Sequence, residues 1–392
     1  MIKNVTDDIK YIGVDDLDLD LFESQYIVPE GMSYNSYLIL DTRVAVMDSV
    51  DARMTGAWLE NLETALEGRK PDYLVVHHME PDHSGSILAF ARKYPQAKIV
   101  ASAKALAFLG QFFDGETFDT LAVKEGDVLE LGAHTLRFFG AAMVHWPEVM
   151  VSFDAKDKVL FTADAFGKFG ALGKCGYFGD EDDDWACEAR RYYFNICGKY
   201  GAPVQVLLKK VLPLEPAVIA PLHGPVLREN LKEYFDLYQT WSTYGVETEG
   251  VFVACASIHG GTLAAAECLK EILLAKGCPK VAMSDLTRDD QAEAVEDAFR
   301  YGRMVVLAAS YDGGLFTPAY HFIHTLQMKS WQKRKVALVE NGTWAPSAGK
   351  VMKELFGVMK DVEMVGDLVT IRSRMKESDR AALEALADAI LQ

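Results

Sequence analysis

Short apolar runs alternate with polar turns in the first half of the chain, with a few helical stretches between them. Residues 35–50, NSYLILDTRVAVMDSV, consist of two strand-like runs joined at Asp41-Thr42-Arg43, which predicts a hairpin. Further strands are expected at residues 73–76, 97–101, 135–139, 149–153 and 218–221, and helices at 57–66 and 86–93. This pattern predicts a mixed α/β domain with histidines at strand ends.

The pattern changes after a helical segment at residues 228–240. The polar stretch 244–250 is the best candidate for a linker. Beyond it, strands are expected at 251–255, 280–283, 304–308, 335–339 and 368–371, each followed by a loop and a helical stretch such as 263–274 or 379–391. Strands that alternate with helices indicate a doubly wound parallel sheet. We expect one domain at residues 1–248 and a second at 249–392.

Length and composition agree with two globular domains. The chain has 392 residues, and single cores tend to stop growing near ~250–300 residues. Half of the residues are hydrophobic and 25% are charged. The 57 acidic and 40 basic side chains give a net charge of −17, which disfavours nucleic acid as a partner because phosphates would be repelled.

The sequence has no apolar run of the roughly 18 residues that span a bilayer, and its first residues lack a signal-peptide core. We therefore expect a cytoplasmic protein without a membrane segment. The six cysteines are scattered and form no CxxC pair, so reduced and partly buried thiols are expected rather than a zinc ribbon, a rubredoxin-type iron site or a thioredoxin-like centre.

The strongest chemical signal is the segment VHHMEPDHSG at residues 76–85, directly after the strand at 73–76. It contains His78, Glu80, Asp82 and His83. Carboxylates and imidazoles this crowded are costly to bury unless a cation neutralises them. An exposed polar loop is the alternative interpretation. His145, Asp164 and His223 also follow apolar segments, and although each alone is more often a structural residue, the set favours a metal site.

These motifs resemble the flavodiiron (A-type flavoprotein) family. The resemblance implies a metallo-β-lactamase-like αββα sandwich in which His78, Glu80 and His145 hold one metal ion, Asp82, His83 and His223 hold the other, and Asp164 bridges them. In some family members the residue that matches His83 is displaced from the metal. The family's hydrolytic relatives carry histidine in place of Glu80, and a carboxylate there favours two iron ions over zinc.

Three aromatic or basic residues near this set are ambiguous. His77 points away from His78 if the strand continues, so a structural role is expected. Tyr192 and Tyr193 could place a phenol near the metal, although tyrosines on a helix more often serve packing. We therefore expect no catalytic residue beyond the metal ligands.

Three loops in the second half follow strands, where open parallel sheets bind ligands. The following residues are candidates for binding a cofactor: Ser257, Ile258, His259, Gly260, Gly261, Thr262, Ser310, Tyr311, Asp312, Gly313, Gly314, Leu315, Asn341, Gly342, Thr343 and Trp344. The first loop opens onto a helix whose N-terminus can hold a phosphate, and Trp344 can stack on a ring. Each loop alone is weak evidence, because tight turns use the same residues.

Together the loops resemble the FMN-binding loops of flavodoxins, in their flavodiiron version, so a flavodoxin-like second domain with FMN is implied. His259 departs from the aromatic residue that is common in the family. The resemblance implies reduction of oxygen to water, of nitric oxide to nitrous oxide, or both, by electrons that pass from FMN to the irons. It also implies a homodimer or dimer of dimers. Because no further domain follows the last helix, the donor is expected to be separate: a rubredoxin, a reductase or a reduced deazaflavin.

Two other classes of function stay open from sequence. A zinc hydrolase with a vestigial flavodoxin domain is disfavoured by Glu80. A non-catalytic electron carrier or gas sensor would not need a convergent ligand set. Metal analysis separates the first alternative from the oxidoreductase, and a turnover assay separates the second.

Overall fold

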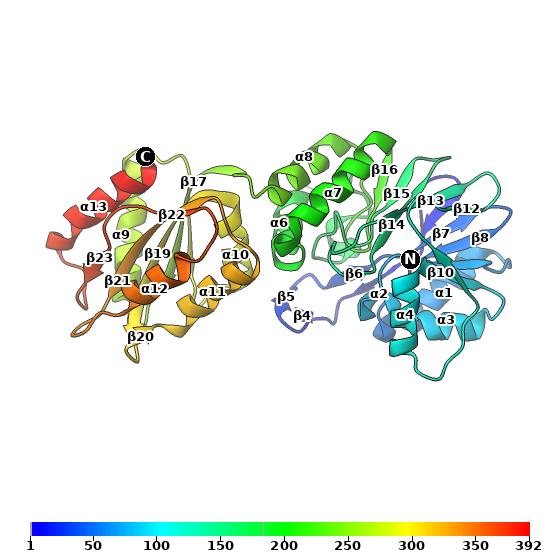
Figure 1. The fold of residues 1–392 in the computed structure, drawn as a ribbon, viewed down its shortest axis with the longest axis horizontal. Coiled ribbons are helices and arrows are strands. Elements are labelled where there is room, and N and C mark those ends of the chain that lie inside the picture. Colours follow the sequence, from blue (N-terminus) through cyan, green and yellow to red (C-terminus); the bar gives the residue numbers. More distant parts are fainter. Residues whose placement is uncertain (1, 183) are drawn as a thin grey trace. The chain divides into compact units, whose positions relative to one another are not determined.

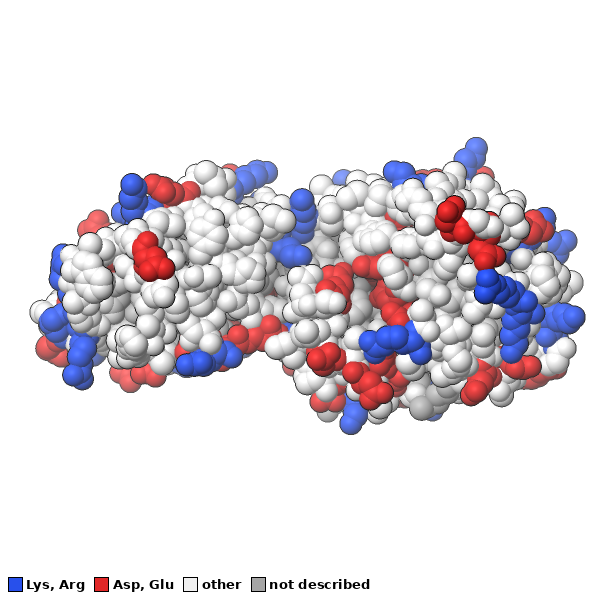
Figure 2. Space-filling view, turned by 90° about the horizontal axis from the view of Figure 1, so that it is seen from below, with Lys and Arg blue, Asp and Glu red and all other residues white. Residues whose placement is uncertain are grey.

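The computed structural model describes residues 2–182 and 184–392. The chain forms two compact units (Figure 1). Unit 1 comprises residues 1–193 and 202–239, and unit 2 comprises residues 194–201 and 240–392. No helix among the described residues is long and apolar enough to cross a membrane. On the face shown in Figure 2, acidic side chains lie among basic ones on both units.

Unit 1 is built on two sheets. The first has the order β1-β2-β7-β8-β9-β10-β11 and the second the order β12-β13-β14-β15-β16. The strands of the first are β1 (Lys3–Asn4), β2 (Ile9–Tyr11), β7 (Tyr37–Leu40), β8 (Val44–Met47), β9 (Tyr73–Val76), β10 (Lys98–Ser102) and β11 (Thr120–Val123). Those of the second are β12 (Val128–Glu130), β13 (Thr135–Gly140), β14 (Met150–Asp154), β15 (Val159–Phe161) and β16 (Val218–Ala220).

The two sheets share one core, which is why the central strands β8 and β9 of the first sheet are apolar throughout. Tyr37 and Val75 of the first sheet belong to the same buried cluster as Leu136 and Phe161 of the second. Strands β8 and β9 are buried at every position, as expected for strands covered on both faces. Helices lie outside both sheets in Figure 1, so unit 1 is a four-layer αββα sandwich of the metallo-β-lactamase type.

The helices and small hairpins of unit 1 complete this sandwich. The helices are α1 (Thr55–Leu66), α2 (Pro81–Ser84), α3 (Ile87–Lys93), α4 (Ala103–Phe112), α5 (Leu172–Cys175), α6 (Trp185–Ile196), α7 (Gly201–Val211) and α8 (Leu231–Ser242). The last three residues of α6 and of α8 and the first residue of α7 belong to unit 2. Two short antiparallel pairs join β3 (Val14–Asp16) to β6 (Met32–Tyr34) and β4 (Leu21–Phe22) to β5 (Tyr26–Ile27).

Unit 2 is a parallel sheet of order β18-β17-β19-β21-β22, the flavodoxin order. Its strands are β17 (Thr248–Ala256), β18 (Val281–Asp285), β19 (Tyr301–Tyr311), β20 (Gly314–Leu315), β21 (Arg334–Asn341), β22 (Val362–Met364) and β23 (Val369–Ile371). Its helices are α9 (Gly261–Ala275), α10 (Gln291–Arg300), α11 (Thr317–Met328), α12 (Ala348–Phe356) and α13 (Glu377–Leu391). The expected fold class is confirmed for both parts of the chain.

One local prediction was wrong. The expected linker 244–250 ends too late, because Thr248–Gly250 already form the start of β17. A register shift between Thr248 and Val251 interrupts the regular pairing at the start of this strand. Gly250, within the shift, has a φ of +153° and leaves no room for a Cβ beside the Lys280 carbonyl. The last strand, expected at 368–371, is confirmed as β23, and the short strand β22 before it, which was not predicted, also pairs with β21.

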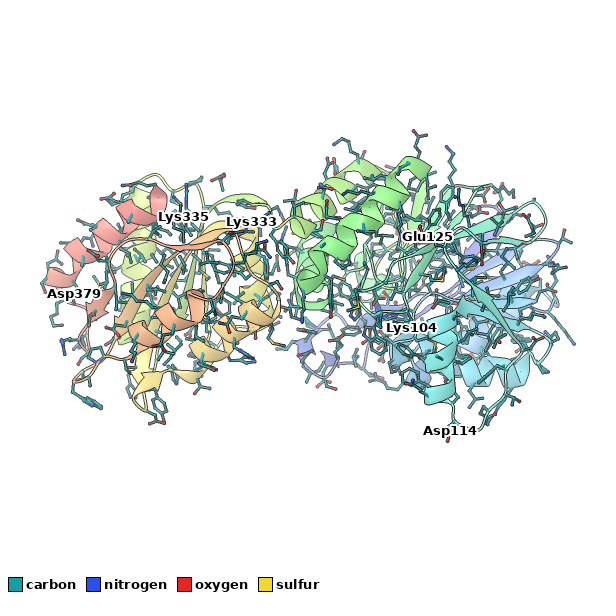
Figure 3. All side chains as sticks on the ribbon, in the orientation of Figure 1. Lys104, Asp114, Glu125, Lys333, Lys335 and Asp379 are labelled. Carbon is teal, nitrogen blue, oxygen red and sulfur yellow. The ribbon has the colours of Figure 1, made fainter. Side chains whose placement is uncertain are left out.

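A buried arginine fixes the chain where it enters unit 2. Arg334 is 3% exposed, and its guanidinium donates to the carbonyls of Tyr244 at 2.7 Å, of Gly245 at 2.9 Å and of Phe299. Burial lowers the pKa of Arg334 to about 10. Its neighbours Lys333 and Lys335 are labelled in Figure 3. The planar guanidinium, with its several N–H donors, therefore holds the connecting segment against the start of β21.

We expect Arg334→Gln to destabilise unit 2 by about 1–3 kcal/mol, because several buried carbonyls lose their donors. Thermal unfolding followed by circular dichroism measures this effect. Lys353→Gln, at an exposed position of α12, is the matched control and is expected to change little. An Arg334→Gln protein as stable as the control variant would contradict the role given to this side chain.

Candidate metal centre and flavin loops

The candidate ligands of unit 1 all lie in segments that follow strands. His78 and Glu80 follow β9, and the turn is fixed by Pro81, the first residue of α2, so that Asp82 and His83 enter on a short helix. His145 lies between β13 and β14, Asp164 follows β15 and His223 follows β16. One sheet therefore supplies four candidate ligands, and the other supplies three.

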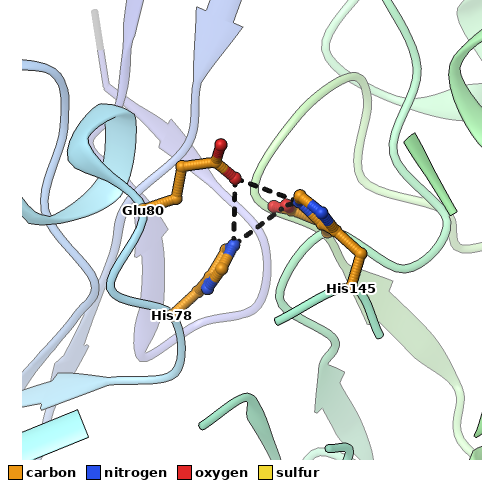
Figure 4. A group of neighbouring side chains, drawn as sticks. His78, Glu80 and His145 are labelled. Atoms are coloured by element: carbon orange, nitrogen blue, oxygen red, sulfur yellow. Dashed lines mark hydrogen bonds and ion pairs between the residues drawn. The ribbon is translucent and has the colours of Figure 1, made fainter. Parts of the chain in front are cut away.

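These side chains meet in two groups. The first contains His78, Glu80, His145 and Asp164, and the second contains Asp82, His83 and His223. In the first group, Glu80 Oε2 lies 3.2 Å from His78 Nε2 and 3.0 Å from His145 Nε2 (Figure 4). In the second group, Asp82 Oδ2 lies 3.4 Å from His83 Nε2 and 3.2 Å from His223 Nε2.

Asp164 joins the two groups. Its Oδ2 lies 3.1 Å from His145 Nε2 and 3.4 Å from His78 Nε2. Its Oδ1 lies 3.0 Å from His83 Nε2 and 3.8 Å from His223 Nε2. The structure thus brings all seven sequence-derived candidates together, in the division that the family resemblance implies.

Several polar atoms of this cluster are buried without a hydrogen-bond partner. They include both carboxylate oxygens of Asp82, Oδ1 of Asp164, and Nε2 of His83 and His223. Leaving such atoms unsatisfied costs about 1–3 kcal/mol each. Their number at one place shows that the side chains suit cations bound between them, because a cation would satisfy oxygens and imidazole nitrogens at once.

The electrostatics of the cluster agree with this interpretation. Burial opposes the negative charge of Glu80, but His145 and His78 lower its pKa to about 2. Burial likewise opposes ionisation of Asp164, yet His83 and His78 hold its pKa well below the usual range. Burial also disfavours a charged His145, while Asp164 and Glu80 raise its pKa to about 9. The carboxylates therefore need positive charge, supplied here by protons on histidine nitrogens.

Contacts on the far side of the ligands orient two of the histidines. His78 Nδ1 lies 2.8 Å from Glu148 Oε1, which also accepts from the Met79 N–H at 3.0 Å. His223 Nδ1 donates to the Ser33 carbonyl at 2.7 Å. Each contact leaves Nε2 directed into the cluster. The sequence did not predict these two partners, because Glu148 and Ser33 lie far along the chain from the histidines that they contact.

The backbone is in the left-handed region beside several of these residues. Asp48 has a φ of +56°, Met143 of +66°, Ala163 of +51° and Phe166 of +67°. Ala163 precedes Asp164, and Met143 lies two residues before His145. Non-glycine residues persist in this region only where surrounding contacts hold them, and such positions gather at functional sites.

His77 and Tyr192, whose roles the sequence left ambiguous, make contacts with other side chains. His77 is directed away from the cluster, with Nδ1 at 2.5 Å from Asp48 Oδ2 and Nε2 at 2.8 Å from Ser152 Oγ. The ring of Tyr192 lies 5.6 Å from that of His223, within an aromatic wall that also contains Phe22. The six cysteines are free thiols, as expected.

The three candidate flavin loops meet at the C-terminal ends of adjacent strands. The first joins β17 to α9, and its Gly260 N–H donates to Ser257 Oγ at 3.1 Å. The second loop, after β19, is a tight hairpin, since Ser310 pairs with Leu315 across a turn at Asp312 and Gly313. Both turn residues have positive φ, the conformation of a two-residue hairpin turn.

The third loop follows β21 and presents an exposed aromatic side chain. Trp344 is 87% exposed and Tyr311 of the second loop is 49% exposed. Gly342 allows the third loop to pack closely against the second, because a Cβ at this position would lie only 3.2 Å from Ser310 Oγ. Beside the first loop lies a cavity of about 520 Å³, lined by Ser257, Ile258 and residues after β18 and β20. This edge of the sheet is where a small ligand is expected in such folds.

Comparisons with known proteins agree with both parts of the chain. Residues 32–224 match the model of the ODP family beta lactamase. Putative diflavin flavoprotein A 2 of Synechocystis is 32% identical over 248 residues, which is 62% of this chain and 42% of that protein. The anaerobic nitric oxide reductase flavorubredoxin of Vibrio vulnificus is 26% identical over 88% of this chain and 70% of its own length. The chain spans about half the length of the diflavin relatives.

Solved structures share the whole fold. Rubredoxin:oxygen oxidoreductase from Desulfovibrio gigas superposes with a TM-score of 0.93 and 24% identity, covering 100% of this chain and 98% of that one. The flavodiiron protein from Giardia intestinalis has a TM-score of 0.91 and 22% identity, covering 99% and 96%. Identity at this level shows the fold. In sequence and in fold the chain is therefore similar to the flavodiiron proteins.

Proposed function

We propose that this protein is an oxidoreductase that reduces dioxygen, nitric oxide or both at a di-iron site, with electrons relayed by FMN. The observation that carries the proposal is the buried pair of ligand groups joined by Asp164, whose two oxygens face two histidines each. The two functional domains that we propose are residues 1–248, which hold the metal, and residues 249–392, which hold the flavin.

His78, Glu80 and His145 would hold one iron, Asp82, His83 and His223 the other, and Asp164 both. Three carboxylates and four histidines form a mixed oxygen and nitrogen donor set that suits iron. Glu80, in place of a further imidazole, makes the set less suited to zinc. When bound, two irons would supply electrons and open coordination positions for a small gas. The buried rings of Phe22 and Tyr192 beside His223 would limit water at this site.

The candidate flavin residues suit FMN. The N-terminus of α9 and the hydroxyls of Ser257 and Thr262 offer donors for a phosphate, while the exposed rings of Trp344 and Tyr311 offer apolar surface for the isoalloxazine. When bound, FMN would accept electrons from a donor and pass them on singly or in pairs. The names of two relatives, flavorubredoxin and rubredoxin:oxygen oxidoreductase, support an external donor such as rubredoxin, with a reductase or reduced deazaflavin as alternatives. A homodimer or dimer of dimers in the cytoplasm completes the proposal.

We predict that Glu148→Gln lowers iron affinity about 10- to 100-fold, because His78 loses the carboxylate that orients its ring and adds to its basicity. Iron binding to the metal-free protein, measured by competition with a chelator, tests this. Glu130→Gln, at an exposed position of β12, is the control. The thermal stability of the metal-free variant is measured as well, since a loss of stability with normal iron affinity would show that Glu148 is only structural.

The decisive test of function is anaerobic stopped-flow mixing of the fully reduced protein with oxygen and, separately, with nitric oxide. Two irons and one FMN per chain are expected, with rapid multi-electron reoxidation by at least one gas. His223→Asn is expected to lose metal and at least about 100-fold in rate, whereas His324→Asn, at an exposed position of α11, is expected to retain both. Two zinc ions with a flavin inert to both gases would instead favour a hydrolase.

A further inference from the structure

The loop Arg372–Lys376 connects β23 to α13 and lies against the candidate flavin loops. Its central residue, Ser373, exchanges two hydrogen bonds with Asn341 of the third loop. The Ser373 N–H donates to Asn341 Oδ1 at 3.0 Å, and Asn341 Nδ2 donates to the Ser373 carbonyl at 2.9 Å. The hydroxyls of Ser373 and Thr343 lie 2.9 Å apart. The loop is therefore fixed to the third flavin loop by side chain and backbone.

The same serine also packs against the first flavin loop. A Cβ on Gly261, the first residue of α9, would lie 2.4 Å from the Ser373 carbonyl, so only glycine fits there. Ser373 itself has a φ of +69°, a conformation that a serine holds only under such constraint. The Arg372–Lys376 loop thus forms a wall beside the helix N-terminus at which a flavin phosphate would bind.

The three basic side chains of this loop differ in their contacts. Lys376 braces it, since Nζ donates to the carbonyls of Arg372 at 3.0 Å and Arg374 at 3.1 Å and lies 3.8 Å from Asp379, labelled on α13 in Figure 3. Arg372 and Arg374 are exposed, and neither guanidinium has an ion pair among the residues that the structure describes. In a chain of net charge −17, two uncommitted cations on either side of Ser373 provide local attraction for an anion.

We propose that the Arg372–Lys376 loop is a fourth wall of the flavin site, in which Arg372 and Arg374 bind and neutralise the phosphate monoester of FMN. This inference rests on the proposed FMN function and adds the residues that select a phosphorylated flavin over riboflavin. Arginine suits this task because its planar donors match phosphate oxygens and stay charged at all relevant pH values.

Flavin binding to the full-length, flavin-free protein tests the proposal. FMN and riboflavin are titrated separately and followed by quenching of flavin fluorescence, for the wild type and for Arg372→Gln/Arg374→Gln. The Kd for FMN is expected to rise about 10- to 100-fold in the double variant, with riboflavin changed less than about twofold. The dependence of the FMN Kd on salt should weaken as well, because two charges are removed. Inorganic phosphate should compete with FMN less effectively in the variant.

The matched control is Arg303→Gln/Lys335→Gln. It removes the same charge near the N-terminal ends of β19 and β21, away from the flavin loops at their C-terminal ends. It should bind FMN like the wild type. An equal loss for FMN and riboflavin in the arginine variant would show that the loop is merely structural, and unchanged binding of FMN would show that the arginines are not used. Wild-type protein that binds neither flavin would instead refute the proposed function itself.

Discussion

The structure of unit 1 depends on the compensation of charge around Asp164. This carboxylate is 1% exposed and lies between two sets of histidine nitrogens, with Asp82 and Glu80 close by. Carboxylates removed from water require opposite charge, and without it they are among the most expensive groups to bury. Protons on the histidines can supply that charge only partly, since the rings are buried too. Metal ions satisfy both kinds of side chain, which links folding of the site to its function.

The scaffold makes this concentration of polar groups possible. The two sheets pack through an apolar core, and the loops that leave β9, β15 and β16 carry ligands beyond its edge. The contacts of Glu148 with His78 and of Ser33 with His223 then select which imidazole nitrogen faces the cluster. Unit 2 has a similar arrangement. Its parallel strands are rigid, and they carry short loops whose glycines allow the backbones of neighbouring loops to approach closely.

The sequence predicted the parts of this molecule that depend on local pattern. The apolar runs at β8 and β9 and the hairpin between β7 and β8 follow from burial and turn chemistry, and the dense motif from His78 to His83 indicated a cation. The start of β17 was missed because a bulge at Gly250 interrupts its alternation. Glu148, Ser33 and Ser373 were missed because their contacts join segments far apart in the chain. Such contacts are fixed by tertiary packing, which no local pattern reports.

The most direct test of the central claim is anomalous X-ray scattering from crystals of the protein, recorded on both sides of the iron and zinc absorption edges. Two iron peaks are expected, one contacted by His78, Glu80 and His145, the other by Asp82, His83 and His223, with Asp164 between them. Peaks at the zinc edge alone, or no metal peak within reach of Asp164, would contradict the assignment of this site to a di-iron centre.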